Sequence, residues 1–140
     1  MSCRWHPSKR SPSTNTDLLP SVLVVDLFAG VCGADYAAGR AWYQRLFGSE
    51  PSFIAHETEC VWELDEHRLL YIEEDPERAG YAVVTIFVDD FDALVKEIGL
   101  RGIEPAKRDT YSNGVRKATY RDPEGNEIGY GGAPAPNPAE

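Results

Sequence analysis

A repeated order of segments constrains this chain more than any other feature of its sequence. Asp35 and Asp90 each stand where a helix N-cap is expected, and an aromatic residue follows each of them. Each helix pattern comes after an apolar run typical of a buried strand and before three short strand candidates. Matching positions in the two halves lie 54 to 58 residues apart. This order predicts two tandem βαβββ modules.

The predicted elements give an α+β fold, in which the two βαβββ modules form a curved mixed sheet with the helices on its convex face. In the first module, a helix from Asp35 to Gly48 lies among strands at 22–31, 52–56, 59–64 and 68–73. In the second, a helix capped by Asp89 or Asp90 ends near residues 99–102 and lies among strands at 81–88, 104–108, 115–120 and 126–130. A turn at residues 122–125, with Pro123 and Gly125, separates the last two strands.

With 140 residues, the chain is expected to form one domain at 21–131, with half-modules at 21–79 and 80–131. Residues 1–20 are rich in Ser, Thr, Pro, Arg and Lys without periodic apolar positions, and 132–140 are mainly Gly, Pro and Ala. Both are expected to be flexible tails. The basic residues of the first tail precede no apolar segment of signal-peptide type, so secretion is not expected.

The composition excludes several kinds of partner. A net charge of −9 and a pI near 4.8 argue against nucleic acid, whose phosphates attract basic surfaces. No apolar run approaches the ~20 residues of a membrane span, so no membrane partner is expected. Three cysteines without a C-x-x-C pair are typical of a reducing cytoplasm rather than of a disulfide framework.

Several short motifs, in order, resemble those of one superfamily. They are Ala34-Asp35-Tyr36 with Leu46-Phe47-Gly48, then Phe87-Val88-Asp89-Asp90, and Asp122-Pro123-Glu124-Gly125-Asn126 before the final strand. Over roughly residues 22–131 the chain resembles the vicinal oxygen chelate superfamily, which contains glyoxalases, bleomycin-resistance proteins and extradiol dioxygenases. The resemblance implies the paired-module fold and leaves the activity open, because the superfamily spans enzymes and drug-binding proteins.

The resemblance also implies four metal-ligand positions, at which family members carry His or Glu. In this chain those positions hold Phe28, Tyr71, Val83 and Gly129. Three of these side chains offer no donor atom, and a neutral tyrosine is a poor ligand for a hard cation. We therefore expect no metal at these positions and no cofactor. His56 and His67, near strand ends, are expected to be solvated or locally hydrogen-bonded.

Side chains alternate faces along a strand, and this alternation assigns ten residues to a cleft on the face away from the helices. They are Asp26, Phe28, Val61, Glu63, Tyr71, Val83, Thr85, Phe87, Thr119 and Glu127. This mixture of aromatic, apolar and acidic groups suits a cationic, partly planar ligand. The alternative is that the carboxylates are solvated and that Phe28 fills a collapsed cleft. The acidic segment 57–77 is expected to be a solvated hairpin edge.

Three functions follow from these features. The first is a metal-independent binder that sequesters or senses a cationic or aromatic small molecule, like bleomycin-resistance proteins. The second is a divalent-metal-dependent lyase or dioxygenase with Asp26, Glu63 and Glu127 as displaced ligands. The third is a non-catalytic interaction protein. Because the superfamily commonly joins two pairs of modules, a homodimer is expected that covers Phe28, Val83 and Phe87.

Overall fold

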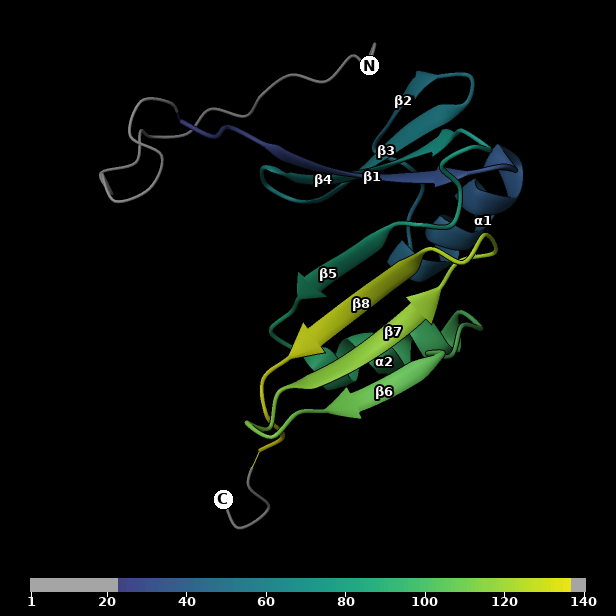
Figure 1. The fold of residues 1–140 in the computed structure, drawn as a ribbon. Helices are drawn as coiled ribbons and strands as arrows, with labels where there is room; N and C mark the ends of the chain where they lie inside the picture. Colours follow the sequence, from purple (N-terminus) through teal and green to yellow (C-terminus); the bar gives the residue numbers. More distant parts are fainter. Residues whose placement is uncertain (1–22, 137–140) are drawn as a thin grey trace.

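The computed structural model describes residues 23–136 of the chain (Figure 1). The two predicted tails, 1–20 and 132–140, therefore lie wholly or partly outside the described residues. The first module contains β1 (Leu27–Gly33), α1 (Tyr36–Phe47), β2 (Phe53–His56), β3 (Glu59–Asp65) and β4 (Arg68–Glu74). The second contains β5 (Val83–Phe87), α2 (Phe91–Leu100), β6 (Lys107–Thr110), β7 (Arg116–Arg121) and β8 (Glu127–Gly132). The predicted order βαβββ, twice, is confirmed.

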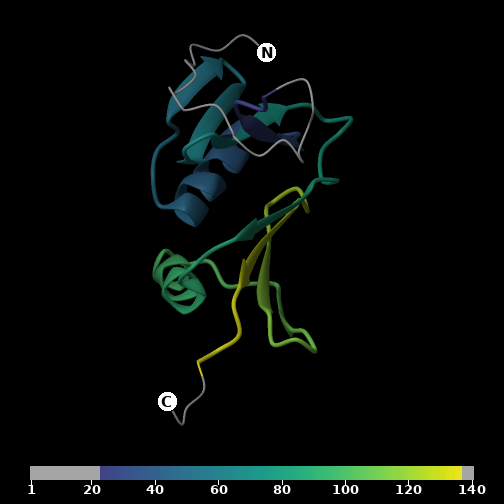
Figure 2. The ribbon, with the colours of Figure 1, turned by 90° about the vertical axis from the view of Figure 1, so that its left-hand side faces the viewer.

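The strands form two four-stranded mixed sheets with the same internal order. The first sheet has the order β1-β4-β3-β2 and the second β5-β8-β7-β6. In each sheet the first strand runs parallel to the last strand of its module, and the other pairs are antiparallel. One helix covers one face of each sheet, and the other face of each sheet bears no helix (Figures 1 and 2).

Local sequence sets the helix ends as predicted. The carboxylates of Asp35 and Asp90 accept hydrogen bonds from the backbone N–H three residues later, at 3.0 and 3.2 Å. These bonds satisfy amides that the first turn of a helix leaves unpaired. At the end of α1, Gly48 adopts φ 74°, a left-handed conformation that glycine accommodates without strain.

The largest departures from the predicted strand boundaries are at the starts of β1 and β6. β1 begins at Leu27 rather than at residue 22, because its partner β4 begins only at Arg68. The chain turns at His67, which has φ 66°, so residues before Leu27 have no strand to pair with. β6 lies at 107–110 rather than 104–108, since its place is set by pairing with Arg116–Thr119 of β7.

One apolar core lies between the helices and the sheets. The alternation that predicts the cleft residues also predicts that the residues between them face the helices. Eight of these belong to the buried cluster: Cys60, Trp62, Leu70, Ile72, Ala118, Tyr120, Ile128 and Tyr130. Five more are partly buried and pack against it: Ala29, Leu64, Val84, Ile86 and Val88. This prediction is wrong for the start of the first strand. Val25 and Leu27 are 42% and 69% exposed, because α1 does not extend over them.

The helix ends join the two modules. Arg45, in the last turn of α1, donates to the carbonyls of Arg101 and Gly102 at 3.2 and 3.0 Å. Arg101, at the end of α2, donates in return to the carbonyls of Arg45 and Leu46. The two sheets lie at a large angle, so that Figure 1 shows the first edge-on and the second face-on. Neither helix within residues 23–136 is long and apolar enough to cross a membrane.

Candidate functional site

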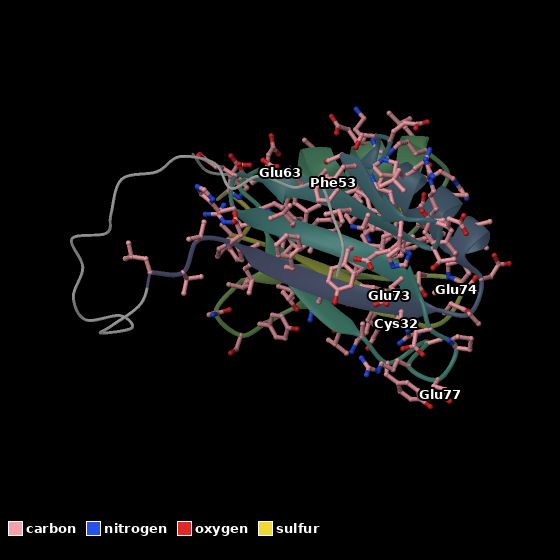
Figure 3. All side chains as sticks on the ribbon, turned by 90° about the horizontal axis from the view of Figure 1, so that it is seen from above. Cys32, Phe53, Glu63, Glu73, Glu74 and Glu77 are labelled. Carbon is pink, nitrogen blue, oxygen red and sulfur yellow. The ribbon has the colours of Figure 1, made fainter. Side chains whose placement is uncertain are left out.

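The helix-free face of the first sheet, which we call the first face, consists of three rows of side chains across paired strands. The first row contains Cys32, Glu73, Glu59 and His56; the second contains Gly30, Tyr71, Val61 and Phe53; the third contains Phe28, Leu69 and Glu63. Figure 3 looks down on this face, where Cys32 and Glu73 lie beside each other. The rows bring four predicted site residues together: Phe28, Val61, Glu63 and Tyr71.

Tyr71 is at the centre of the first face. Its ring lies 6.5 Å from that of Phe28, at an interplanar angle of 57°. Its hydroxyl extends over β1, where a Cβ on Gly30 would come within 2.4 Å of the oxygen. Glycine at position 30 therefore provides the space that the phenol occupies. Burial, and then the nearby carboxylates of Glu73 and Glu59, raise the pKa of Tyr71, so the phenol stays neutral and can donate a hydrogen bond.

The helix-free face of the second sheet, the second face, carries Val83, Thr85, Phe87, Thr119 and Glu127 from the predicted set. Together with neighbouring basic side chains, Val83, Thr119 and Glu127 line a small pocket of about 130 Å³. Lys107, Lys117 and Arg121 supply the basic groups of this pocket. Oε1 of Glu127 lies 3.5 Å from Nη2 of Arg121, so the guanidinium partly neutralises this carboxylate.

The residues at the four family metal positions do not fit a metal ion. Phe28 and Tyr71 present aromatic rings, and Val83 is 70% exposed without a donor atom. A Cβ built on Gly129 would lie 2.5 Å from Cε of Lys117 and 3.4 Å from its Nζ. The aliphatic stem of a lysine, with its ammonium nearby, fills the space of the fourth family ligand, and a positive charge there opposes cation binding.

Thr85 and Phe87 line a groove of about 710 Å³ between the modules. Apolar side chains from the inner strands β1 and β5 form much of its wall, including Leu27, Ala29, Val84, Ile86 and Val88. Alternation assigns these residues to the helix side, and Ala29, Val84, Ile86 and Val88 do pack against the core there, while Leu27 does not. Within one chain, the ten predicted residues therefore do not form a single cleft. They are divided among the first face, the second face and the start of β1, and Thr85 and Phe87 also line this groove at the edge of the second face.

Asp26 is the residue at the start of β1, and it is already engaged. Its Oδ1 lies 2.9 Å from Nδ1 of His67, and its side chain is 6% exposed. Because the left-handed turn at His67 brings the imidazole back against the chain, this carboxylate pairs locally rather than facing a cleft. His67 thus bonds to a residue distant in sequence, whereas His56 makes the expected local hydrogen bond, which its Nδ1 accepts from the backbone N–H of Thr58.

Sequence reasoning missed the burial of Glu59. The acidic side chains of segment 57–77 were expected to be solvated at a hairpin edge, yet Glu59 is only 2% exposed. Burial, followed by the repulsion of Glu73, raises the pKa of the Glu59 carboxyl. Burial also raises the pKa of the Cys32 thiol, with Glu73 and Asp75 adding to the effect, so Cys32 is a poor nucleophile. The apolar neighbours Cys60, Val61 and Trp62 were the one signal that this strand is central.

The two faces differ in charge. The first face carries the carboxylates of Glu59, Glu63 and Glu73. On the second face the basic groups of Lys107, Lys117 and Arg121 outnumber the acids, Asp109 and Glu127. The first face is therefore suited to cations and the second to anions or to an acidic protein surface.

Comparison with known proteins identifies the class to which this paired βαβββ fold belongs. Residues 25–130 match the family model of the Glyoxalase/Bleomycin resistance protein/Dioxygenase superfamily. The chain belongs to this superfamily. No curated protein matched the chain.

Solved structures agree with this assignment. A glyoxalase/bleomycin resistance protein from Catenulispora acidiphila is 55% identical, with 78% of this chain and 98% of that chain covered and a TM-score of 0.75. A bleomycin-binding protein complexed with bleomycin is 16% identical, with 76% and 97% covered and a TM-score of 0.63. A lactoylglutathione lyase from Agrobacterium tumefaciens is 21% identical, with 81% and 94% covered and a TM-score of 0.61. The last two similarities show the fold alone.

Proposed function

We propose that the protein binds a cationic or aromatic small molecule and needs no metal ion at the four family positions to do so. The observation that carries this proposal is the replacement of the family ligands by groups that contact organic molecules. Tyr71, whose ring lies against that of Phe28, offers an aromatic surface for stacking, and Glu63 offers an exposed carboxylate on the same face. Binding of this kind would serve to sequester or sense the ligand.

We propose further that the cleft is completed by a second copy of the chain. In a two-fold dimer the acidic first face of one protomer would meet the basic second face of its partner, so that local attraction offsets the repulsion between chains of −9. Large apolar side chains near the inner edges support such contact: Leu27, Val83 and Phe87 are 69%, 70% and 65% exposed. Burying one such side chain contributes ~1.5–3 kcal/mol.

The same exposed apolar groups fit the alternative of a non-catalytic interaction protein, in which a different partner covers them. The metal-dependent alternative has less support. Asp26 pairs with His67, and Glu127 pairs with Arg121 on the other module. Within residues 23–136, no group of side chains close enough to hold one ion includes Asp26, Glu63 or Glu127.

A thermal-shift screen tests the proposal. The metal-stripped protein is heated with a panel of cationic glycopeptides, including bleomycin, and of aromatic natural products and metabolites. A ligand at one hundred times its dissociation constant is expected to add ~2.7 kcal/mol of stability. An unchanged melting curve across the panel would contradict small-molecule binding. We place this activity in the cytoplasm, where free thiols such as those of Cys32 and Cys60 persist.

A further inference from the structure

The first row of the first face gathers three metal-binding groups outside the family positions. His56, Glu59 and Glu73 each offer one ligand atom, and these atoms all lie within 4.8 Å of one another. Strand pairing sets their closeness: Glu59 is the direct partner of His56 on β2 and of Glu73 on β4. The cluster is thus fixed by two strand ladders rather than by a loop.

Glu59 is the unusual member of this cluster. Only 2% of its side chain is exposed. Its Oε1 lies 3.0 Å from Nε2 of His56. Its other oxygen, Oε2, is buried without any hydrogen-bond partner. Leaving a buried carboxylate oxygen without a partner destabilises the folded chain. This oxygen therefore lacks a hydrogen-bond donor or a cation, and the residues that the structure describes supply neither.

Glu73 increases the need for positive charge. Like charges directly opposite each other on neighbouring strands are destabilising, and among residues 23–136 neither carboxylate is paired with a lysine or arginine. The imidazole of His56 is the one basic group that contacts this pair in the described part of the chain. Its ring is half-exposed, since 44% of its side chain is open to solvent, which leaves a route of entry.

The protonation of His56 is compatible with metal binding. Nδ1 accepts a hydrogen bond from the backbone N–H of Thr58 at 3.3 Å, so in the neutral ring the proton is on Nε2 and is donated to Glu59. The hydroxyl of Thr58 lies 3.4 Å from the same Nδ1. If Nε2 binds a metal, the proton moves to Nδ1, which then no longer accepts the Thr58 N–H and instead donates to the Thr58 hydroxyl, and this bond orients the ring.

We propose that His56, Glu59 and Glu73 form a binding site for one divalent transition-metal ion, such as Zn²⁺. One imidazole nitrogen with two carboxylate oxygens suits Zn²⁺, Co²⁺ or Mn²⁺ better than Ca²⁺, which prefers oxygen ligands alone. Metal–ligand distances of ~2.0–2.2 Å require only a small inward movement of the three groups. Within one chain, Lys117 is on the other module and does not reach this cluster.

The test is a titration of full-length, untagged protein, stripped with a chelator, with Zn²⁺ by calorimetry and with Co²⁺ by visible absorption. We expect one equivalent to bind with micromolar affinity. The variants His56→Asn, Glu59→Gln and Glu73→Gln should each lose about tenfold or more in affinity. Nitrogen NMR of His56 should show the proton moving from Nε2 to Nδ1 when Zn²⁺ is added.

Glu74→Gln is the matched control, because Glu74 is an exposed glutamate next to Glu73 on β4 and lies outside the proposed ligand site; it should bind Zn²⁺ like the unmodified chain. Circular dichroism checks that each variant is folded, and Glu73→Gln removes a less buried group should Glu59→Gln fail to fold. The proposal is overturned if millimolar Zn²⁺ does not bind, if binding is unchanged in all three variants, or if Ca²⁺ binds more tightly than Zn²⁺.

Discussion

Arg45 and Arg101 each bind the C-terminal end of the other's helix. The guanidinium of Arg45 donates to the carbonyls of Arg101 and Gly102, and that of Arg101 donates to the carbonyls of Arg45 and Leu46. Helix C-termini leave carbonyls unpaired and attract positive charge. The exchange is reciprocal because the two arginines occupy nearly equivalent places in the repeat, and it holds the modules in their observed orientation.

Replacing either arginine by alanine should therefore destabilise the chain. Hydrogen bonds from a charged donor contribute about 1–2 kcal/mol at a partly exposed site, and we expect a loss of this size in urea unfolding for Arg101→Ala. Arg68→Ala is the control, since Arg68 is exposed and pairs only with nearby Asp65. In a double-mutant cycle the two losses should not add, because each change also frees carbonyls next to the other. If each loss of stability is no larger than that of Arg68→Ala, and the two losses add, the reciprocal contact does not stabilise the chain.

A second prediction concerns assembly. Light scattering at micromolar concentration should give twice the chain mass of 15.6 kDa. Phe87→Asp should shift the protein to the single-chain mass, because it places a charge on the exposed apolar surface proposed to meet the partner. Leu100→Asp is the matched control, because Leu100 is 80% exposed on α2, away from both faces. A single-chain mass for the unmodified protein at every salt concentration would rule the dimer out.

The third prediction follows from the raised pKa of Glu59, whose ordinary value is 4.5. Below pH 4.5 the carboxyl is protonated in both the folded and the unfolded chain. As the pH rises past this ordinary value, the unfolded chain releases its proton while the folded chain still holds it. The stability that the protonated Glu59 carboxyl contributes therefore falls until the pH has passed the folded-state pKa. With a chelator present, Glu59→Gln should thus gain on the unmodified chain between pH 4 and pH 7, by on the order of 1 kcal/mol.

This difference is measured as the urea midpoint of the two proteins at each pH. Glu63→Gln, at an exposed position, should show no comparable gain. An unmodified chain that gains stability relative to Glu59→Gln as the pH rises would mean that the Glu59 carboxylate is favourably paired in the folded state.

Local features of the sequence predicted much of this fold. Asp35, Gly48 and Asp90 fix helix ends through bonds within one turn, so nearby residues suffice to place them. The start of β1 depends on where β4 begins, and β6 carries the polar sequence Lys107–Thr110, without alternation. The ends of these strands are set by pairing with distant residues, which a local pattern does not encode.

The candidate site was predictable only in part. Alternation correctly placed Phe28, Val61, Glu63 and Tyr71 on one face, because register follows from the apolar pattern of β3 and β4. It gave no information on the angle between the modules, which separates these residues from Val83 and Glu127. The pairing of Asp26 with His67 was also hidden, because it depends on an uncommon backbone conformation at His67.

We propose that the first face binds a small molecule without a metal ion at the four family positions. The most direct measurement is calorimetric titration of the chain with the best ligand from the thermal-shift screen, with and without excess chelator. We predict the same dissociation constant in both, and a loss of about tenfold or more for Tyr71→Ala, which removes the central ring. Binding that disappears with chelator, or that is unchanged in Tyr71→Ala, would contradict the account.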